Sequence, residues 1–273
     1  MTLRIWHQSF TVLAELGAYD AALRRHFRAV ARPDTTIGLH GVRPGTYRSN
    51  YPGHDIKHAA LQRLHALQFV AAAIRAEREG YDAFALSTLP EPALADIRSL
   101  VDIPVVGYGE AAMLAACGMG RRFGALVFID ELAELVEDNA RRLDLSERCV
   151  GARPVGFRFD DVLAGFADPA PLIERFCAAA RRLVAEGADV VIPGEAPLAV
   201  LLAANGVTEI DGAAVVDPLA AWIGEAERLV DLKRAGRAWR SRRGYFAARP
   251  DPDRIDEVFA FYGLSGWLTE AER

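Results

Sequence analysis

Cysteine is scarce in this sequence of 273 residues: Cys117, Cys149 and Cys177 lie far apart and form no CxxC pair. This spacing indicates neither a disulfide framework nor a zinc knuckle and is typical of a reducing compartment. Long apolar runs are lacking too, since none reaches the roughly 18 residues of a membrane span. The first residues do not resemble a signal peptide. We therefore expect a cytoplasmic protein that does not contact a membrane.

An excess of basic charge is also missing. The sequence has 32 Lys and Arg against 37 Asp and Glu, a net charge of −5, so it lacks the positive field that collects nucleic acid. The Gly-rich motifs of nucleotide sites, GxGxxG and GxxxxGK[ST], are absent. These absences favour a small-molecule substrate, with no nucleic acid as partner, and leave a homo-oligomer open.

Two local clusters have ordinary explanations. His54, His58 and His65 fall near one helical face, but an HxxxH pair without glutamate is a weak metal motif, and we predict no metal site. The Arg-rich segment 236–246 contains aromatic residues, which we expect to pack on the body of the protein or on a neighbouring subunit. The aromatic residues of this tail region are Trp239, Tyr245, Phe246, Phe259 and Phe261.

Short apolar runs alternate with longer amphipathic stretches along most of the chain. Buried strands that alternate with helices predict an α/β protein with mostly parallel sheets covered on both faces. The expected strands are 3–6, 35–39, 83–86, 105–106, 124–129, 190–192 and 213–216. The clearest expected helices are 59–78, 130–143, 171–186 and 218–234.

The pattern is also doubled. Two strand ends, Ala-Leu-Ser87-Thr88-Leu-Pro and Val-Ile-Pro-Gly194-Glu195-Ala-Pro, each follow a helix that ends in Glu-Gly. We expect two pseudo-symmetric Rossmann-like halves, residues 1–117 and 118–217, with residues 218–273 packing back on the body. Because ligands bind beyond the carboxyl ends of parallel strands, both strand ends indicate one active site between the halves.

Four segments carry a family resemblance: YDAFAL at 81–86, IPVVGYGEAA at 103–112, GADVVIPG at 187–194 and DPLA at 217–220. In this order they resemble the aspartate/glutamate/hydantoin racemase superfamily. The resemblance implies two pseudo-symmetric α/β halves around an active site without a cofactor. Members of that superfamily include racemases, maleate isomerases and arylmalonate decarboxylases.

The sequence departs from the racemases of this superfamily at the two catalytic cysteines, one of which they place at each strand end. Ser87 or Thr88 stands at the first position and Glu195 at the second. A hydroxyl is a good donor to an enolate oxygen but a weak acid, so Ser87 and Thr88 are predicted to bind an oxyanion. Glu195 is the predicted acid/base, because burial can raise its pKa. There are structural alternatives for all three residues. Ser87 and Thr88 could instead cap the N-terminus of the next helix, and Glu195 could be an acidic residue that stabilises the positive end of a helix dipole.

Further candidates follow other strands. Gln8 and Ser9 come after the first strand and are expected to bind a carboxylate, or else to cap a helix. His40 closes the second strand, ahead of a long Gly/Pro/Tyr-rich segment, 41–54, that contains Tyr47 and is either a lid or an exposed insertion. Gly194 lets a substrate approach the backbone, and Ala196 is expected to contact it as well. Glu110 either orients an active-site group or begins a helix. These six substrate-binding candidates are Gln8, Ser9, His40, Tyr47, Gly194 and Ala196.

The sequence therefore predicts a cofactor-independent isomerase, of the racemase or epimerase type. It would do acid/base chemistry at a carbon next to a carbonyl or carboxylate of a small anionic or cyclic amide substrate, with His40 or water as the second proton source. One strong base also fits a decarboxylase, lyase or hydrolase. A second alternative is a protein that binds a small carboxylate without chemistry.

Overall fold

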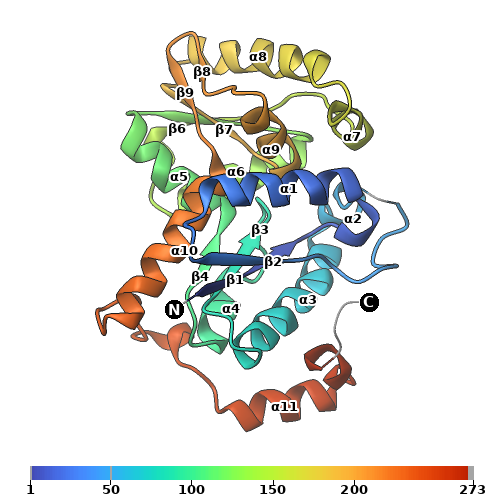
Figure 1. Ribbon diagram of the computed structural model, residues 1–273, viewed down its shortest axis with the longest axis vertical. Helices are drawn as coiled ribbons and strands as arrows, with labels where there is room; N and C mark the ends of the chain where they lie inside the picture. Colours follow the sequence, from blue (N-terminus) through green and yellow to red (C-terminus); the bar gives the residue numbers. More distant parts are fainter. Residues whose placement is uncertain (1, 50, 270–273) are drawn as a thin grey trace.

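Two β-sheets, one in each half of the chain, form the framework of the structure (Figure 1), a computed structural model that describes residues 2–49 and 51–269. The first sheet has the strand order β2-β1-β3-β4, and all its neighbouring strands are parallel. β3 is buried along its whole length, as expected of a strand covered on both faces. The strands of this sheet are β1 (Leu3–Ser9), β2 (Thr35–His40), β3 (Ala83–Ser87) and β4 (Val105–Gly107).

The second sheet repeats the plan of the first. Its order is β6-β5-β7-β9-β8, and only the short β8 runs antiparallel to its neighbour. When β5, β6, β7 and β9 are matched to β1, β2, β3 and β4, the two strand orders are identical. This topology confirms the predicted α/β fold of two pseudo-symmetric, mostly parallel halves. The strands are β5 (Phe123–Val127), β6 (Cys149–Pro154), β7 (Val190–Pro193), β8 (Glu209–Ile210) and β9 (Ala213–Val215).

Helices connect the strands and cover the sheets. Those predicted at 59–78 and 218–234 coincide with α3 and α10, and those at 130–143 and 171–186 correspond to α6 and α8. The described helices are α1 (Gly17–Val30), α2 (Gly53–Ile56), α3 (Ala59–Arg78), α4 (Leu94–Leu100), α5 (Tyr108–Met119), α6 (Asp130–Arg142), α7 (Phe159–Gly165), α8 (Ala170–Ala185), α9 (Ala196–Ala204), α10 (Pro218–Arg234) and α11 (Pro252–Phe261). Short 3₁₀ turns occur at Leu13–Glu15, Ser146–Arg148, Tyr245–Ala247 and Ser265–Leu268.

The last helix of each half crosses to the other half. α5 follows β4 and contacts β5 and β7 of the second sheet as well as β3 and β4 of its own, whereas α10 follows β9 and packs on β1, β3 and β4 of the first sheet. The two helices also pack on each other. The boundary expected after residue 117 therefore falls inside α5, and the element that returns to the first half is α10.

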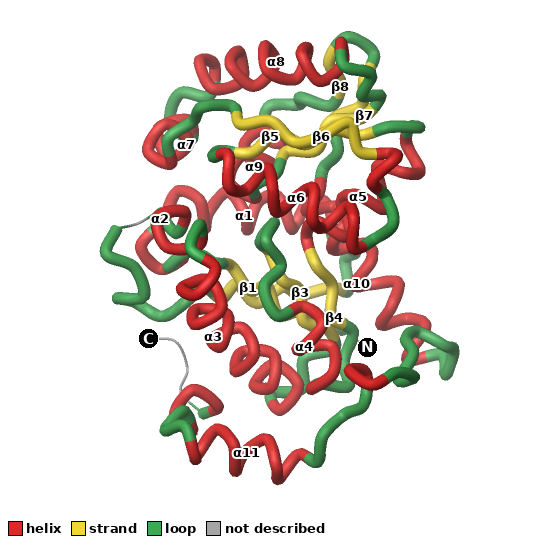
Figure 2. Tube along the Cα trace, turned by 180° about the vertical axis from the view of Figure 1, so that it is seen from behind, coloured by secondary structure: helices red, strands yellow, loops and turns green. Residues whose placement is uncertain are grey.

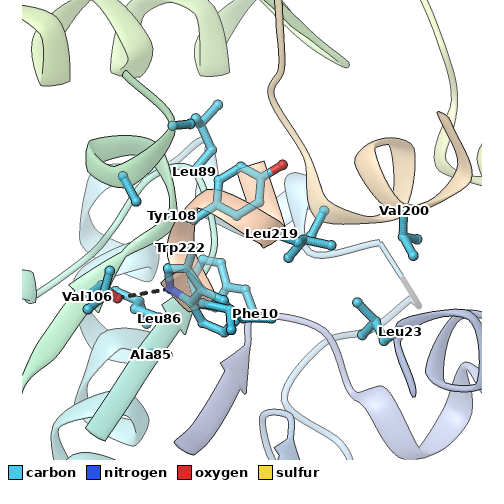
Figure 3. Packing of buried hydrophobic residues seen from close by; sticks show 14 of the residues in the cluster. Phe10, Leu23, Ala85, Leu86, Leu89, Val106, Tyr108, Val200, Leu219 and Trp222 are labelled. Carbon is cyan, nitrogen blue, oxygen red and sulfur yellow. Dashed lines mark hydrogen bonds between the residues drawn. The ribbon is translucent and has the colours of Figure 1, made fainter. Parts of the chain in front are cut away.

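Trp222 anchors α10 to the first sheet. Its ring is fully buried, and its Nε1 donates a hydrogen bond of 3.1 Å to the carbonyl oxygen of Val106 in β4 (Figure 3). Leu219 and Tyr108 lie beside it in the same apolar cluster. A buried indole that satisfies its N–H in this way fixes both the position and the rotation of the helix.

The segment after α10 runs back along the first half and ends in α11 and a 3₁₀ turn that packs on α3. Phe259 is 8% exposed and packs inward, as predicted. Phe246 and Phe261 are each 83% exposed, so these two rings are not buried against the body, and their packing on a neighbouring subunit stays a prediction. The side chain of Tyr245 lies outside the described residues. Within the described residues, no helix is both long enough and apolar enough to span a bilayer.

Candidate active site

A cavity of about 70 Å³ lies where the carboxyl ends of strands from both sheets face each other. Ser9 of β1, Ser87 of β3 and Glu195 after β7 meet there, so each half contributes strand-end residues, as predicted. Figure 2 shows α1, α6 and α9, which carry further lining residues or flank them, in the layer between the two sheets. The lining residues are Ser9, Phe10, Thr11, Tyr19, Pro52, Ile56, Ser87, Thr88, Leu89, Pro90, Phe128, Leu132, Phe159, Glu195, Ala196 and Pro197.

Glu195 provides the carboxylate of this pocket. It precedes the first residue of α9, yet its side chain does not cap that helix. Instead its Oε1 accepts a hydrogen bond of 2.8 Å from the backbone N–H of Phe128, at the end of the neighbouring strand. Its Oε2 is buried and has no hydrogen-bond partner among the described residues. The carboxylate is thus held at one oxygen and left open at the other.

The environment of Glu195 favours the protonated form. Burial raises the pKa of its carboxyl to about 8, although the Phe128 N–H opposes that rise by stabilising the anion. No histidine, lysine or arginine from residues 2–49 or 51–269 lines the pocket, so no cation lowers the pKa in compensation. A carboxyl whose pKa lies near neutrality in a pocket is suited to accept or donate protons.

Ser87 and Thr88 stand at the end of β3 in the first half and line the same pocket as Glu195 of the second half. The Oγ of Ser87 is buried and has no hydrogen-bond partner in the described part of the chain. Neither residue caps α4, because the residue before that helix is Ala93, which has a left-handed backbone (φ +59°). The capping explanation is therefore wrong for this helix, and the Ser87 hydroxyl remains available to a bound molecule.

The hydroxyls of Ser9 and Thr11 add to the polar side of the pocket. Their oxygens are 2.8 Å apart, and Ser9 Oγ also accepts the backbone N–H of Thr11 at 3.1 Å. Ser9 does not cap the 3₁₀ turn that follows. Tyr19, from α1, also lines the pocket; the sequence reasoning missed it, although Tyr19, Ala22, Leu23 and Phe27 follow the spacing of a buried helix face.

Four predicted substrate-binding residues are not among the lining residues, and each has a structural explanation. Gln8 accepts a hydrogen bond from Trp6 Nε1 and donates to the carbonyls of Ser9 and Gly41. His40 stacks on Trp6 with ring centroids 3.5 Å apart. Tyr47 donates its hydroxyl proton to the Phe10 carbonyl at 2.8 Å.

Gly194 is the fourth of these residues. A Cβ at this position would lie 2.6 Å from Val127 Cγ1 and 2.8 Å from the Leu126 carbonyl oxygen. The glycine therefore permits close packing of β7 on β5, which is a reason different from substrate approach. Ala196, predicted beside it, does line the pocket.

The long segment at 41–54, together with Ile56 just after it, reaches the pocket through residues other than His40 and Tyr47. Pro52 and Ile56 line the cavity, and the ring of Tyr51 stacks on Phe159 of α7, with centroids 5.3 Å apart. Burial and the nearby Glu195 both raise the pKa of the Tyr51 hydroxyl, so that group stays protonated. This segment thus connects the first half to the second across the pocket.

Among the described residues that line the pocket there is no cysteine and no metal-binding cluster. Cys117, Cys149 and Cys177 lie on α5, β6 and α8, and none is a lining residue. Across residues 2–49 and 51–269, no group of three His, Cys, Asp or Glu side chains is arranged to hold a metal ion. The chemical groups at hand are one carboxyl and several hydroxyls.

Most of the chain matches a racemase family. Residues 18–226 match the family Asp/Glu/Hydantoin racemase. The hydantoin racemase of Pseudomonas sp. (strain NS671) is 29% identical over 161 residues, which is 58% of this chain and 62% of that protein. The chain thus spans less than two thirds of the length of this curated relative.

Solved structures share the fold. The allantoin racemase of Klebsiella pneumoniae superimposes with a TM-score of 0.73 and 22% identity, over 92% of this chain and 94% of that one. The glutamate racemase of Thermus thermophilus gives a TM-score of 0.55 and 20% identity, over 98% and 94% of the two chains. Since the family match covers most of the sequence, the chain belongs to the Asp/Glu/hydantoin racemase family.

Proposed function

We propose that this protein is a cofactor-independent isomerase, of the racemase or epimerase type, that moves a proton at the carbon next to a carbonyl of a neutral cyclic amide such as a 5-substituted hydantoin. The observation that carries the proposal is Glu195: a buried carboxyl with a pKa of about 8, one oxygen held by Phe128 and the other without a partner. Family membership supports the isomerase class.

Glu195 acts as the base in this proposal. With a pKa near 8, about half of the side chains are ionised at pH 8, and the anion is basic enough to take a proton from an activated carbon. Oε2 is the oxygen that accepts the proton, since Oε1 already accepts the Phe128 N–H. Return of this proton by the carboxyl restores the original configuration, whereas protonation on the opposite face inverts it and leaves the carboxyl to release its proton to solvent.

Ser87 and Thr88 stabilise the intermediate. Loss of the proton moves negative charge to the neighbouring carbonyl oxygen, which becomes an enolate. Donors that already point at the place where charge develops lower the barrier without reorganisation. The Oγ of Ser87 has no partner among the described residues and can donate its proton there.

The lining of the pocket indicates a neutral substrate. The described lining contains no cation to pair with a substrate carboxylate, and a second anion beside the buried Glu195 would be costly. Phe10, Phe128 and Phe159 supply apolar surface for a ring or an aliphatic substituent. A cyclic amide fits this chemistry better than an amino dicarboxylate.

Racemisation also needs a proton on the opposite face of the carbon. His40, which the sequence suggested for this role, is stacked on Trp6 away from the pocket. The hydroxyls of Ser9 and Thr11, 2.8 Å apart, form a relay by which a solvent proton reaches the first-half side. In this proposal, water is therefore the second proton source.

One observation favours a second candidate. Glu195 is the only carboxyl, and the only group with a pKa near neutrality, that lines the pocket among the described residues. A single acid/base suits a decarboxylase, lyase or hydrolase, in which an enolate is protonated on one face or a water molecule is activated. Retention of configuration at the reacting carbon would identify this case.

The experiment is proton NMR of one enantiomer of 5-benzylhydantoin in heavy water at pH 8, with optical activity followed in parallel. We expect the C5 proton to exchange and optical activity to be lost at the same time. Glu195→Gln should lower both rates by about 100-fold or more, the usual contribution of a general base. Glu134→Gln, at an exposed position of α6, is the matched control.

Two results would contradict the proposal. Exchange with retained optical activity would move the protein to single-face chemistry, and phenylmalonate would then be tested for loss of carbon dioxide. Full activity of Glu195→Gln would remove Glu195 as the base, whatever the substrate.

A further inference from the structure

α6 contacts both chemical sides of the pocket. Phe128 lies just before Ile129, the residue that precedes α6, and its N–H holds Glu195. In the last turn of α6, Asn139 Nδ2 donates a hydrogen bond of 3.0 Å to the carbonyl of Leu89, next to the Ser87-Thr88 pair. A helix of this length spans about 20 Å. The segment from Phe128 to the end of α6 thus links the carboxyl to the loop that carries the hydroxyls.

That loop has an unusual backbone. Glu91 and Ala93 have φ values of +47° and +59°, in the left-handed region that residues other than glycine rarely adopt. A conformation of this kind persists only where the surroundings impose it. These two residues follow β3 and the Ser87-Thr88 pair closely in the chain.

The surroundings of Glu91 supply that constraint. Its side chain is 1% exposed; Oε1 accepts the N–H of Glu110 at 2.7 Å and Oε2 accepts Arg142 Nη2 of α6 at 2.9 Å. A Cβ on Gly107 would lie 2.3 Å from Oε1, so a glycine leaves the room that the carboxylate occupies.

A second ion pair supports the first. Arg98 donates to both carboxylate oxygens of Glu110, at 3.0 and 2.7 Å, and Arg142 Nη1 lies 3.6 Å from the same carboxylate. Glu110 lies in the first turn of α5, close to one of its two predicted interpretations, and its N–H is one of the donors that hold Glu91. Both halves therefore contribute to one network around the loop.

We propose that Glu91 and Asn139 are positioning residues that lock the segment from Ser87 to Glu91 onto α6 and so set the placement of the Ser87 and Thr88 hydroxyls relative to Glu195. They touch the loop rather than the substrate, since neither lines the pocket. This inference rests on the proposed function, in which those hydroxyls stabilise the enolate.

Glu91→Gln is the main test variant. Glutamine keeps the volume and the acceptor for the Glu110 N–H, but it removes the ion pair with Arg142. Arg142 is 45% exposed in its side chain and can turn to water, so the variant is expected to fold. Asn139→Asp is the second variant, because it replaces the donor to the Leu89 carbonyl by an acceptor. Arg141→Gln is the control, on the same helix turn and outside the network.

The first readout is the rate of C5 proton exchange with 5-benzylhydantoin. We expect kcat to fall about 10- to 100-fold in both test variants with little change in KM, because small misplacement of a catalytic group has effects of this size. The apparent pKa of about 8 should persist, since Glu195 is held at the other end of α6. A general loss of structure would change KM and the pH profile together.

A double-mutant cycle with Thr88→Val identifies the route of the effect. If Glu91 acts through the hydroxyl loop, Glu91→Gln in the Thr88→Val background should lower kcat much less than it does alone. Full additivity would overturn the positioning role. If Thr88→Val and Glu195→Gln had no effect themselves, the proposed function would fail instead.

The second readout needs no substrate. Amide hydrogen exchange of the peptide covering residues 87–94 should rise in Glu91→Gln and Asn139→Asp and stay unchanged in Arg141→Gln. Unchanged exchange in both test variants would refute the lock, even if no hydantoin proved to be a substrate.

Discussion

Replacing Glu195 by glutamine should make the protein more stable at alkaline pH while it abolishes activity. The carboxyl has a pKa of about 8 in the folded protein against an ordinary value of 4.5. A raised folded pKa means that the folded state binds the proton more tightly than the unfolded chain. The stabilisation is therefore complete below pH 4.5 and is lost as the pH rises through 8. Glutamine is neutral at every pH, so the variant does not lose stability by this route as the pH rises.

The magnitude follows from the shift. One pKa unit corresponds to about 1.4 kcal/mol, so the wild type should lose about 5 kcal/mol relative to Glu195→Gln above pH 8, and about 3 kcal/mol by pH 7. Burial also raises the pKa of Glu91, to about 7, but both proteins contain Glu91, and its contribution cancels in the difference. These figures are upper values, because the fold can relax around an ionised carboxylate.

The assay is urea denaturation of the wild type, Glu195→Gln and the control Glu134→Gln at pH 5, 7 and 9. The free energy of unfolding of Glu195→Gln should exceed that of the wild type by an amount that grows with pH. The control should follow the wild type at every pH. A difference between wild type and Glu195→Gln that does not change with pH would refute the reasoning, since the carboxylate would then be solvated or paired in the folded state.

Three further predictions concern the pocket and its support. Thr88→Val should lower the exchange rate of 5-benzylhydantoin by about 100-fold, a typical loss for one oxyanion donor, with KM nearly constant in steady-state kinetics; an unchanged kcat would exclude the hydroxyl. Gly194→Ala should cost about 1 to 3 kcal/mol in urea denaturation, because its Cβ would meet Val127 and the Leu126 carbonyl; wild-type stability would show that β7 is not tightly packed there. Trp222→Phe should destabilise by about 1 to 3 kcal/mol in the same assay by leaving the buried Val106 carbonyl without its donor, and a smaller effect would mean that water replaces the indole.

The fold was predictable because its signals are local. Each of the seven expected strands overlaps an observed strand, and the apolar spacing of residues 59–78 and 218–234 fixed both ends of α3 and α10. β6 was not predicted, because it is only partly buried and contains Gly151 at φ +120° with a shift of register beside it. Such a strand has neither the alternation nor the continuous apolar run that sequence patterns reveal.

The site was predictable only where strands end. Ser87, Thr88 and Glu195 follow buried strands, and the topology brings them to one pocket. Phe128 and Tyr19 also belong to the pocket; the first lies at the end of an expected strand and the second on an apolar helix face, but the sequence does not show that these positions meet the site, because the packing of one half on the other brings them there. Glu91 illustrates the same limit: in Leu-Pro-Glu-Pro it is an ordinary turn residue, and its burial depends on Arg142, 51 positions away.

The exchange of α5 and α10 between the halves has a consequence for folding. Each sheet is covered in part by a helix that the other half supplies, so neither half can bury its own apolar surface alone. Unfolding one half would strip the partner sheet of its cover, and the two should melt together in a single cooperative transition. Expressed separately, residues 1–117 and 118–273 would each lack helix surface that covers part of their sheet. Only the joined chain would form the pocket between the halves.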